Sequence, residues 1–110
     1  MEPRVTIGMP TYNRVEYLQR TINSILNQTY KDFELLIYDD GSSDNTLVLL
    51  ESYNDKRLSY VSFKNQGPPK PLNYIYEKAK GEFIIILHDH DIFSKKLIFF
   101  FENCHRINIF

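Results

Sequence analysis

The sequence has a single cysteine and no long apolar run. Cys104 cannot form an internal disulfide, which fits a reducing compartment. No apolar stretch approaches the roughly 20 residues of a membrane span, and the N-terminus lacks the basic head and apolar centre of a signal peptide. We therefore expect a cytoplasmic protein, with membrane association of a longer parent chain as the alternative.

An excess of basic residues is also missing. Lys and Arg total 13 against 14 for Asp and Glu, which gives a formal net charge of -1. Binding to a nucleic-acid backbone depends on a positive field, so nucleic acid is excluded as a partner.

Glycine is scarce as well. The four glycines, Gly8, Gly41, Gly67 and Gly81, never form G-x-G-x-x-G, and no G-x-x-x-x-G-K-[ST] loop is present. The usual dinucleotide fingerprint and the P-loop are therefore both excluded.

The composition is that of an ordinary globular protein. The chain has 110 residues, of which 43% are hydrophobic and 25% charged. This length is close to the common size of one domain, and the apolar content is too high for a disordered tail. We expect a single domain over residues 1–110.

Short apolar runs alternate with helical patterns along the chain. The apolar runs predict strands over residues 5–9, 33–38, 58–63 and 83–87, of which the third alternates and so belongs near an edge. A first helix is expected over 15–27, beginning with an Asn13–Glu16 cap, and a second one after the 44–46 region. A third is expected over 72–79, where Leu72, Ile75, Tyr76 and Ala79 share one face and Gly81 ends the helix. This order predicts an α/β fold, a mostly parallel sheet with helices on both faces.

Ligands of such sheets bind outside the carboxyl ends of the strands. That edge should carry Tyr12, the pair Asp39 and Asp40, and the segment His88–Asp91. An ionised Asp can accept a hydrogen bond from an imide N–H such as that of uracil, and Tyr12 offers a flat face to the base. Like charges side by side cost stability, so the Asp pair favours function, whereas residues 41–45 are typical of turns.

The segment His88-Asp89-His90-Asp91 combines imidazoles and carboxylates. Such ligands suit Mn²⁺ or Mg²⁺ with a phosphate, and Asp with His can also bind zinc. A solvated polar loop is the alternative, and the position at the strand end favours the metal site.

Four stretches in order carry a family resemblance: PTYNR (10–14), SILNQTYKDFELLIYDDGSSDNT (24–46), NQG (65–67) and AKGEFIIILHDHD (79–91). From about Val5 to Phe93 the chain resembles the nucleotide-sugar-binding, Rossmann-like half of family-2 glycosyltransferases of the GT-A fold. The resemblance implies that Tyr12 and Asp39 contact the base. It implies further that Asp40 contacts the base or the ribose, that Thr11 contributes backbone contacts, and that Lys70 reaches a phosphate.

The resemblance also implies a divalent cation, Mn²⁺ or Mg²⁺, on an Asp-x-Asp motif. Asp89-His90-Asp91 reads directly as this motif, with Asp89, Asp91 and His90 as the candidate ligands. Anchoring on Ile92-Phe93 instead shifts the motif onto His88-Asp89-His90 and places His90 at the principal ligand position.

The implied reaction is inverting transfer of a sugar from a UDP-linked donor to a saccharide acceptor, as in polysaccharide biosynthesis. The family's general base would lie beyond Phe110, so the catalytic residue is unassigned and the fragment is expected to bind without transfer and to self-associate through uncovered apolar surface. The alternative is a receiver-like module that binds Mg²⁺ and accepts a phosphoryl group.

Overall fold

The computed structural model describes residues 2–64 and 70–88. Strands and helices alternate as predicted. The elements are β1 (Val5–Thr11), α1 (Val15–Leu26), β2 (Phe33–Asp39), α2 (Thr46–Glu51), β3 (Leu58–Ser62), α3 (Lys70–Lys78) and β4 (Phe83–Ile86).

The four strands form one sheet in the order β3-β2-β1-β4, and all of the pairings are parallel. β1 and β2 pair along their whole length, from Val5 with Phe33 to Thr11 with Asp39. The predicted fold class is confirmed, and so is the edge position of β3. Within residues 2–64 and 70–88, β4 is the other outer strand; Ile84 and Ile86 are half-buried there, so only its alternate residues are fully buried.

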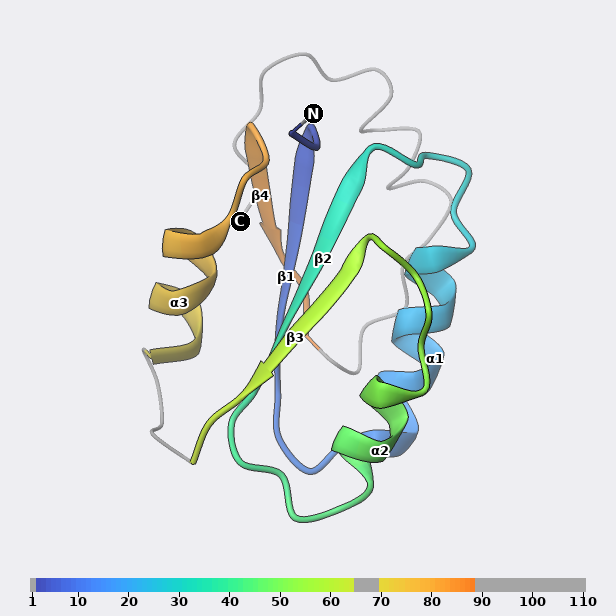
Figure 1. The fold of residues 1–110 in the computed structure, drawn as a ribbon, viewed down its shortest axis with the longest axis vertical. Helices are drawn as coiled ribbons and strands as arrows, with labels where there is room; N and C mark the ends of the chain where they lie inside the picture. Colours follow the sequence, from blue (N-terminus) through green and yellow to red (C-terminus); the bar gives the residue numbers. More distant parts are fainter. Residues whose placement is uncertain (1, 65–69, 89–110) are drawn as a thin grey trace.

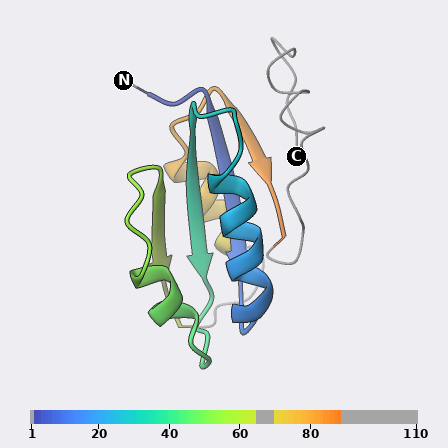
Figure 2. The same ribbon diagram turned by 90° about the vertical axis from the view of Figure 1, so that its right-hand side faces the viewer.

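Helices cover both faces of the sheet. Figure 1 shows α3 on one side and α1 with α2 on the other, and Figure 2 shows α1 and α2 together over the same face. The larger core lies under α1 and α2, where Leu18, Ile22 and Ile25 pack against the buried side chains of β1 and β2. Every second residue of β1 and β2 from Val5 and Phe33 onward faces this core, and the amphipathic α1 covers it, as its apolar pattern predicts.

On the other face, a glycine brings α3 close to the sheet. A Cβ added to Gly8 in β1 would lie 2.4 Å from Cγ2 of Ile75, which is fully buried in α3. The absence of a side chain at Gly8 therefore sets the distance between helix and strand.

α1 begins at Val15 as predicted, but two predicted end signals are wrong, the Asn13–Glu16 cap of α1 and Gly81 as the end of α3. Arg14 occupies the position before α1, and Asn13 does not cap the helix; Asp44 accepts the Val15 amide hydrogen instead, at 3.1 Å. α3 ends at Lys78, and Gly81 has a different role: a Cβ there would lie 2.5 Å from the Thr6 nitrogen. Tyr76, predicted on the buried face, is 42% exposed because Ile75 takes the position under the helix.

No helix in the part of the chain that the structure describes is long and apolar enough to cross a bilayer. The apolar C-terminal segment, on which the expectation of self-association depends, lies outside the described residues.

Candidate functional site

A cavity of about 700 Å³ lies at the carboxyl ends of β1, β2 and β4. Its wall is formed by Pro10, Thr11, Tyr12, Arg14, Asp40, Pro71, Leu72, Tyr76, Ile86 and His88. The residues come from three strand ends and from the first turns of α3. A parallel sheet predicts a ligand site at this edge, and the structure places this cavity there.

The floor of the cavity is fixed by the register of the two central strands. Thr11 pairs with Asp39 at the end of β1 and β2, and the Asp40 amide donates a hydrogen bond to the Thr11 carbonyl oxygen at 3.0 Å. Tyr12 and Asp40 therefore follow directly after two paired strand ends, and both line the cavity.

The two adjacent acids have different environments. Asp39 is fully buried. Its Oδ1 accepts hydrogen bonds from the Ser42 hydroxyl and, at 3.2 Å, from the Ser42 amide, and its Oδ2 accepts from the Ser62 hydroxyl at 2.8 Å. Asp39 is absent from the cavity wall, so the structure gives it a role inside the fold, where a buried carboxylate needs such partners.

Asp40 is the acid that lines the cavity. Its charge also acts on Tyr38: burial, then the negative charge of Asp40 and the neighbouring Tyr74, raises the pKa of the Tyr38 phenol above its usual value. Asp40 can thus offer a carboxylate at the same wall as Tyr12, whose side chain is 46% exposed.

Two groups at the site were not assigned a nucleotide contact from the sequence. Arg14 stands within the PTYNR stretch and lines the cavity, and His88, considered above only for the metal motif, lines it from the end of β4. The sequence indicated that His88 lies at the site, because it directly follows an apolar strand. For Arg14 the only indication was its position in the PTYNR stretch. A guanidinium beside an aromatic and a carboxylate suits a ligand with both a base and an anionic part.

Lys70 does not lie at this cavity. It lines a separate hollow of about 250 Å³ together with Tyr38, Phe63, Asn73, Tyr74 and Glu77. The structure therefore brings Thr11, Tyr12 and Asp40 together at the cavity wall, with Asp39 buried beside Thr11 and Lys70 at another hollow.

The predicted metal ligands Asp89, His90 and Asp91 lie outside the described residues. Among residues 2–64 and 70–88, no three His, Cys, Asp or Glu side chains come together as a metal site. The last described residue before the predicted ligands, His88, lines the cavity.

The sequence matches glycosyl transferase family 2 over residues 6–102. The chain belongs to this family. Over 81% of its length this family-2 chain is 38% identical to the GalNAc(5)-diNAcBac-PP-undecaprenol beta-1,3-glucosyltransferase of Campylobacter jejuni, of which it covers 30%. It spans less than half the length of the curated relatives that it matches.

Solved structures share the fold of this family-2 chain. The crystal structure of S. aureus TarS 1-349 in complex with UDP is 31% identical with a TM-score of 0.79, and the match covers 90% of this chain and 32% of that chain. The mannosyltransferase PcManGT from Pyrobaculum calidifontis, in complex with GDP-Man and Mn²⁺, is 25% identical with a TM-score of 0.78, over 89% of this chain and 31% of that chain. These findings favour the glycosyltransferase over the receiver-like alternative.

Proposed function

We propose that this family-2 chain forms the donor-binding part of an inverting, metal-dependent glycosyltransferase that uses a UDP-linked sugar and transfers the sugar to a saccharide acceptor. The observation that carries the proposal is the cavity at the strand ends, where Tyr12 and Asp40 meet Arg14 and His88. The UDP complex of TarS, a protein with the same fold, supports uridine as the nucleoside.

In this proposal the base packs against Tyr12, and Asp40 accepts the hydrogen bond of the imide N–H. Asp40, rather than Asp39 as the resemblance implies, makes the base contact, because Asp39 is buried and already bonded to Ser42 and Ser62. A charged acceptor makes a stronger hydrogen bond than a neutral one, and a half-exposed aromatic ring offers area for stacking.

Arg14 is placed to attract the diphosphate, because a guanidinium matches phosphate oxygens in geometry and charge. A divalent cation held by Asp89, Asp91 and His90 would neutralise the charge of the departing nucleoside diphosphate. The Mn²⁺ complex of PcManGT supports this part of the proposal.

Calorimetric titration of the 110-residue chain tests the proposal. UDP should bind more tightly than GDP or TDP, and its affinity should rise when Mn²⁺ is present. Equal affinity for all three diphosphates would contradict the assignment of uridine as the nucleoside. A UDP affinity unaffected by Mn²⁺ or Mg²⁺ would contradict the proposed metal dependence.

A further inference from the structure

Hydrogen bonds join the two loops that carry Tyr12 and Asp40. The Asn13 amide donates to the Ser42 hydroxyl at 2.8 Å, and the Ser43 amide donates to Asn13 Oδ1 at 2.7 Å. Asn13 directly follows Tyr12, and Ser42 is two residues beyond Asp40. The bonds therefore link the segment after β1 to the segment after β2 beside the cavity.

The backbone of Asn13 is in the left-handed region, with φ at 51°. This conformation is uncommon for residues with a side chain, and Asn tolerates it better than most. The two bonds to Ser42 and Ser43 hold Asn13 in it, so the chain direction directly after Tyr12 depends on them.

Asp44 joins the same loops one step further along. Its Oδ2 accepts from the Val15 amide at 3.1 Å, at the start of α1, and its Oδ1 accepts from the Thr46 amide at 3.0 Å and from the Thr46 hydroxyl, at the start of α2. Burial alone would raise the pKa of Asp44, but the hydrogen bonds from Thr46 and Val15 outweigh it and lower the pKa.

This set, which we call the loop network, consists of Asn13, Ser42, Ser43 and Asp44. Ser42 also donates to the buried Asp39, so the loop network is connected to the end of β2. Tyr12 directly precedes Asn13, Asp40 lies two residues before Ser42, and both line the cavity.

We propose that Asn13 and Asp44 are positioning residues, which hold Tyr12 and Asp40 in the arrangement that receives the nucleoside. The inference rests on the proposed function. If Tyr12 and Asp40 are already in the binding arrangement before the ligand arrives, less conformational entropy is lost on binding. Asn13 and Asp44 therefore raise the affinity without contacting the ligand.

A double-mutant cycle tests the inference by UDP titration in the presence of Mn²⁺. Asn13→Gly tolerates the left-handed backbone and removes the acceptor for Ser43. It should weaken UDP binding about five-fold in the wild-type background, as expected for one lost neutral hydrogen bond. In the Tyr12→Ala background, where only Asp40 remains to be positioned, the same change should weaken binding only about two-fold, because coupled residues are not additive.

Asp44→Ala should weaken UDP binding as well. Asp55→Asn is the matched control, since it removes a hydrogen-bonded carboxylate at the other end of the sheet and should leave the dissociation constant unchanged. Equal dissociation constants for Asn13→Gly, Asp44→Ala and the wild type would overturn the inference alone, as would the same loss in both backgrounds. Absence of UDP binding by the wild type would overturn the proposed function and this inference with it.

Discussion

Asp39 and Asp40 differ by one position in the chain and lie in opposite environments. Asp39 is on the same face of β2 as Phe33, Leu35 and Ile37, and it is completely buried, whereas Asp40 lines the cavity. Because side chains alternate along a strand, adjacent acids at a strand end are directed to different sides. Their substitutions should therefore have different effects.

Asp39→Asn should lower the free energy of unfolding by about 1–3 kcal/mol, because it removes the charge that accepts from Ser42 and Ser62. Asp40→Asn should change stability by less than about 0.5 kcal/mol and weaken UDP binding by roughly 1.5–3 kcal/mol, the usual value of a hydrogen bond to a charged group. Urea unfolding and calorimetry measure the two quantities. A stable Asp39→Asn variant that loses UDP binding would return the base contact to Asp39.

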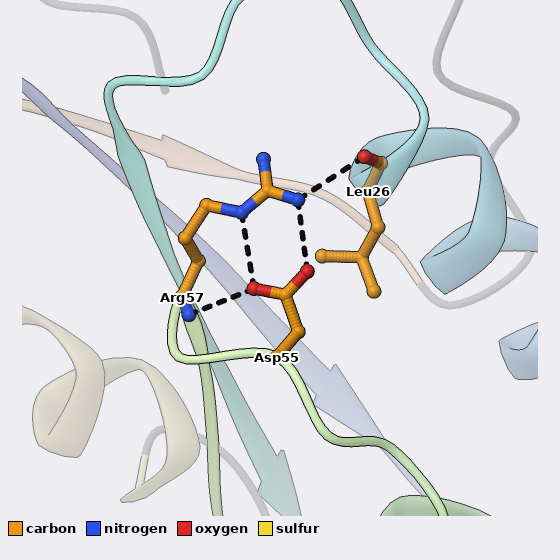
Figure 3. Close-up of polar contacts among 3 residues, drawn as sticks. All are labelled: Leu26, Asp55 and Arg57. Carbon is orange, nitrogen blue, oxygen red and sulfur yellow. Dashed lines mark hydrogen bonds and ion pairs between the residues drawn. The ribbon is translucent and has the colours of Figure 1, made fainter.

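At the level of the elements, Arg57 forms an ion pair with Asp55 within the segment before β3 and a hydrogen bond that joins this segment to the end of α1. Arg57 Nη2 donates to Asp55 Oδ2 at 2.9 Å and to the Leu26 carbonyl oxygen at 3.2 Å (Figure 3). The guanidinium carbon lies 4.7 Å from the centroid of the Phe33 ring. Arg57 Nη1 is buried and has no hydrogen-bond partner among the described residues, so packing on the ring accompanies the ion pair there.

The ion pair between Asp55 and Arg57 should make the free energy of unfolding depend on pH in the acidic range. Hydrogen bonds from Arg57 lower the pKa of Asp55, although burial opposes them. A carboxyl whose pKa is lowered by folding adds stability above its unfolded pKa of about 3.9, and that stability is lost as the pH falls through the folded value. Asp55→Asn should therefore be less stable than the wild type at pH 7, and the difference should shrink below about pH 4.

Urea unfolding at pH 7, 5, 4 and 3 measures this difference, with Glu51→Gln as a control for the loss of one exposed carboxylate. A difference between Asp55→Asn and the wild type that stays constant down to pH 3 would show that the charge of Asp55 is not what stabilises the segment.

The contact of α3 with β1 gives a second prediction about elements. Gly8→Ala should destabilise the fold by about 1–3 kcal/mol, since the new methyl would meet Ile75 Cγ2 at 2.4 Å. In a background of Ile75→Ala, which removes that atom, the added cost of Gly8→Ala should largely disappear. Thermal unfolding of the four variants measures the coupling, and an additive result would contradict the steric explanation.

The elements themselves were predictable from the sequence because they depend on local patterns. The apolar runs of β1 to β4 and the repeating Leu18, Ile22 and Ile25 of α1 are visible without a structure. The start of α1 at Val15 was also predicted, but the acceptor of the Val15 amide hydrogen was not, because Asp44 lies 29 residues away in the chain. The helix-capping pattern depends only on residues close in the sequence, so it pointed to Asn13 and Glu16.

The location of the candidate site could be predicted from the sequence, but its residues only in part. Strand ends of a parallel sheet placed Tyr12 and the Asp pair correctly at one edge. The alternation along β2 puts Asp39 in phase with Leu35 and Ile37, and that signal identifies which acid is buried. Tyr76 and Arg14 reach the cavity through the packing of whole elements, which the sequence pattern does not contain.

Over the whole molecule, the proposed site lies at one end of the sheet, and a hollow lined by Phe63, Lys70 and Tyr74 lies on the α3 side. Both are lined by aromatic rings, an acid and a cation, but the first has about 700 Å³ and lies at the paired ends of β1 and β2, whereas the second has about 250 Å³. Only the strand-end cavity should bind the nucleotide. The backbone amides around each hollow can show which of the two is occupied.

The most direct test is an amide NMR titration of the 110-residue chain with UDP and Mg²⁺. We expect chemical-shift changes concentrated at residues 11–14 and 40–42, with little change at Phe63 and Tyr74. Shifts confined to Phe63, Lys70 and Tyr74, or none at saturating UDP, would contradict the claim that the strand-end cavity is a nucleotide-sugar site.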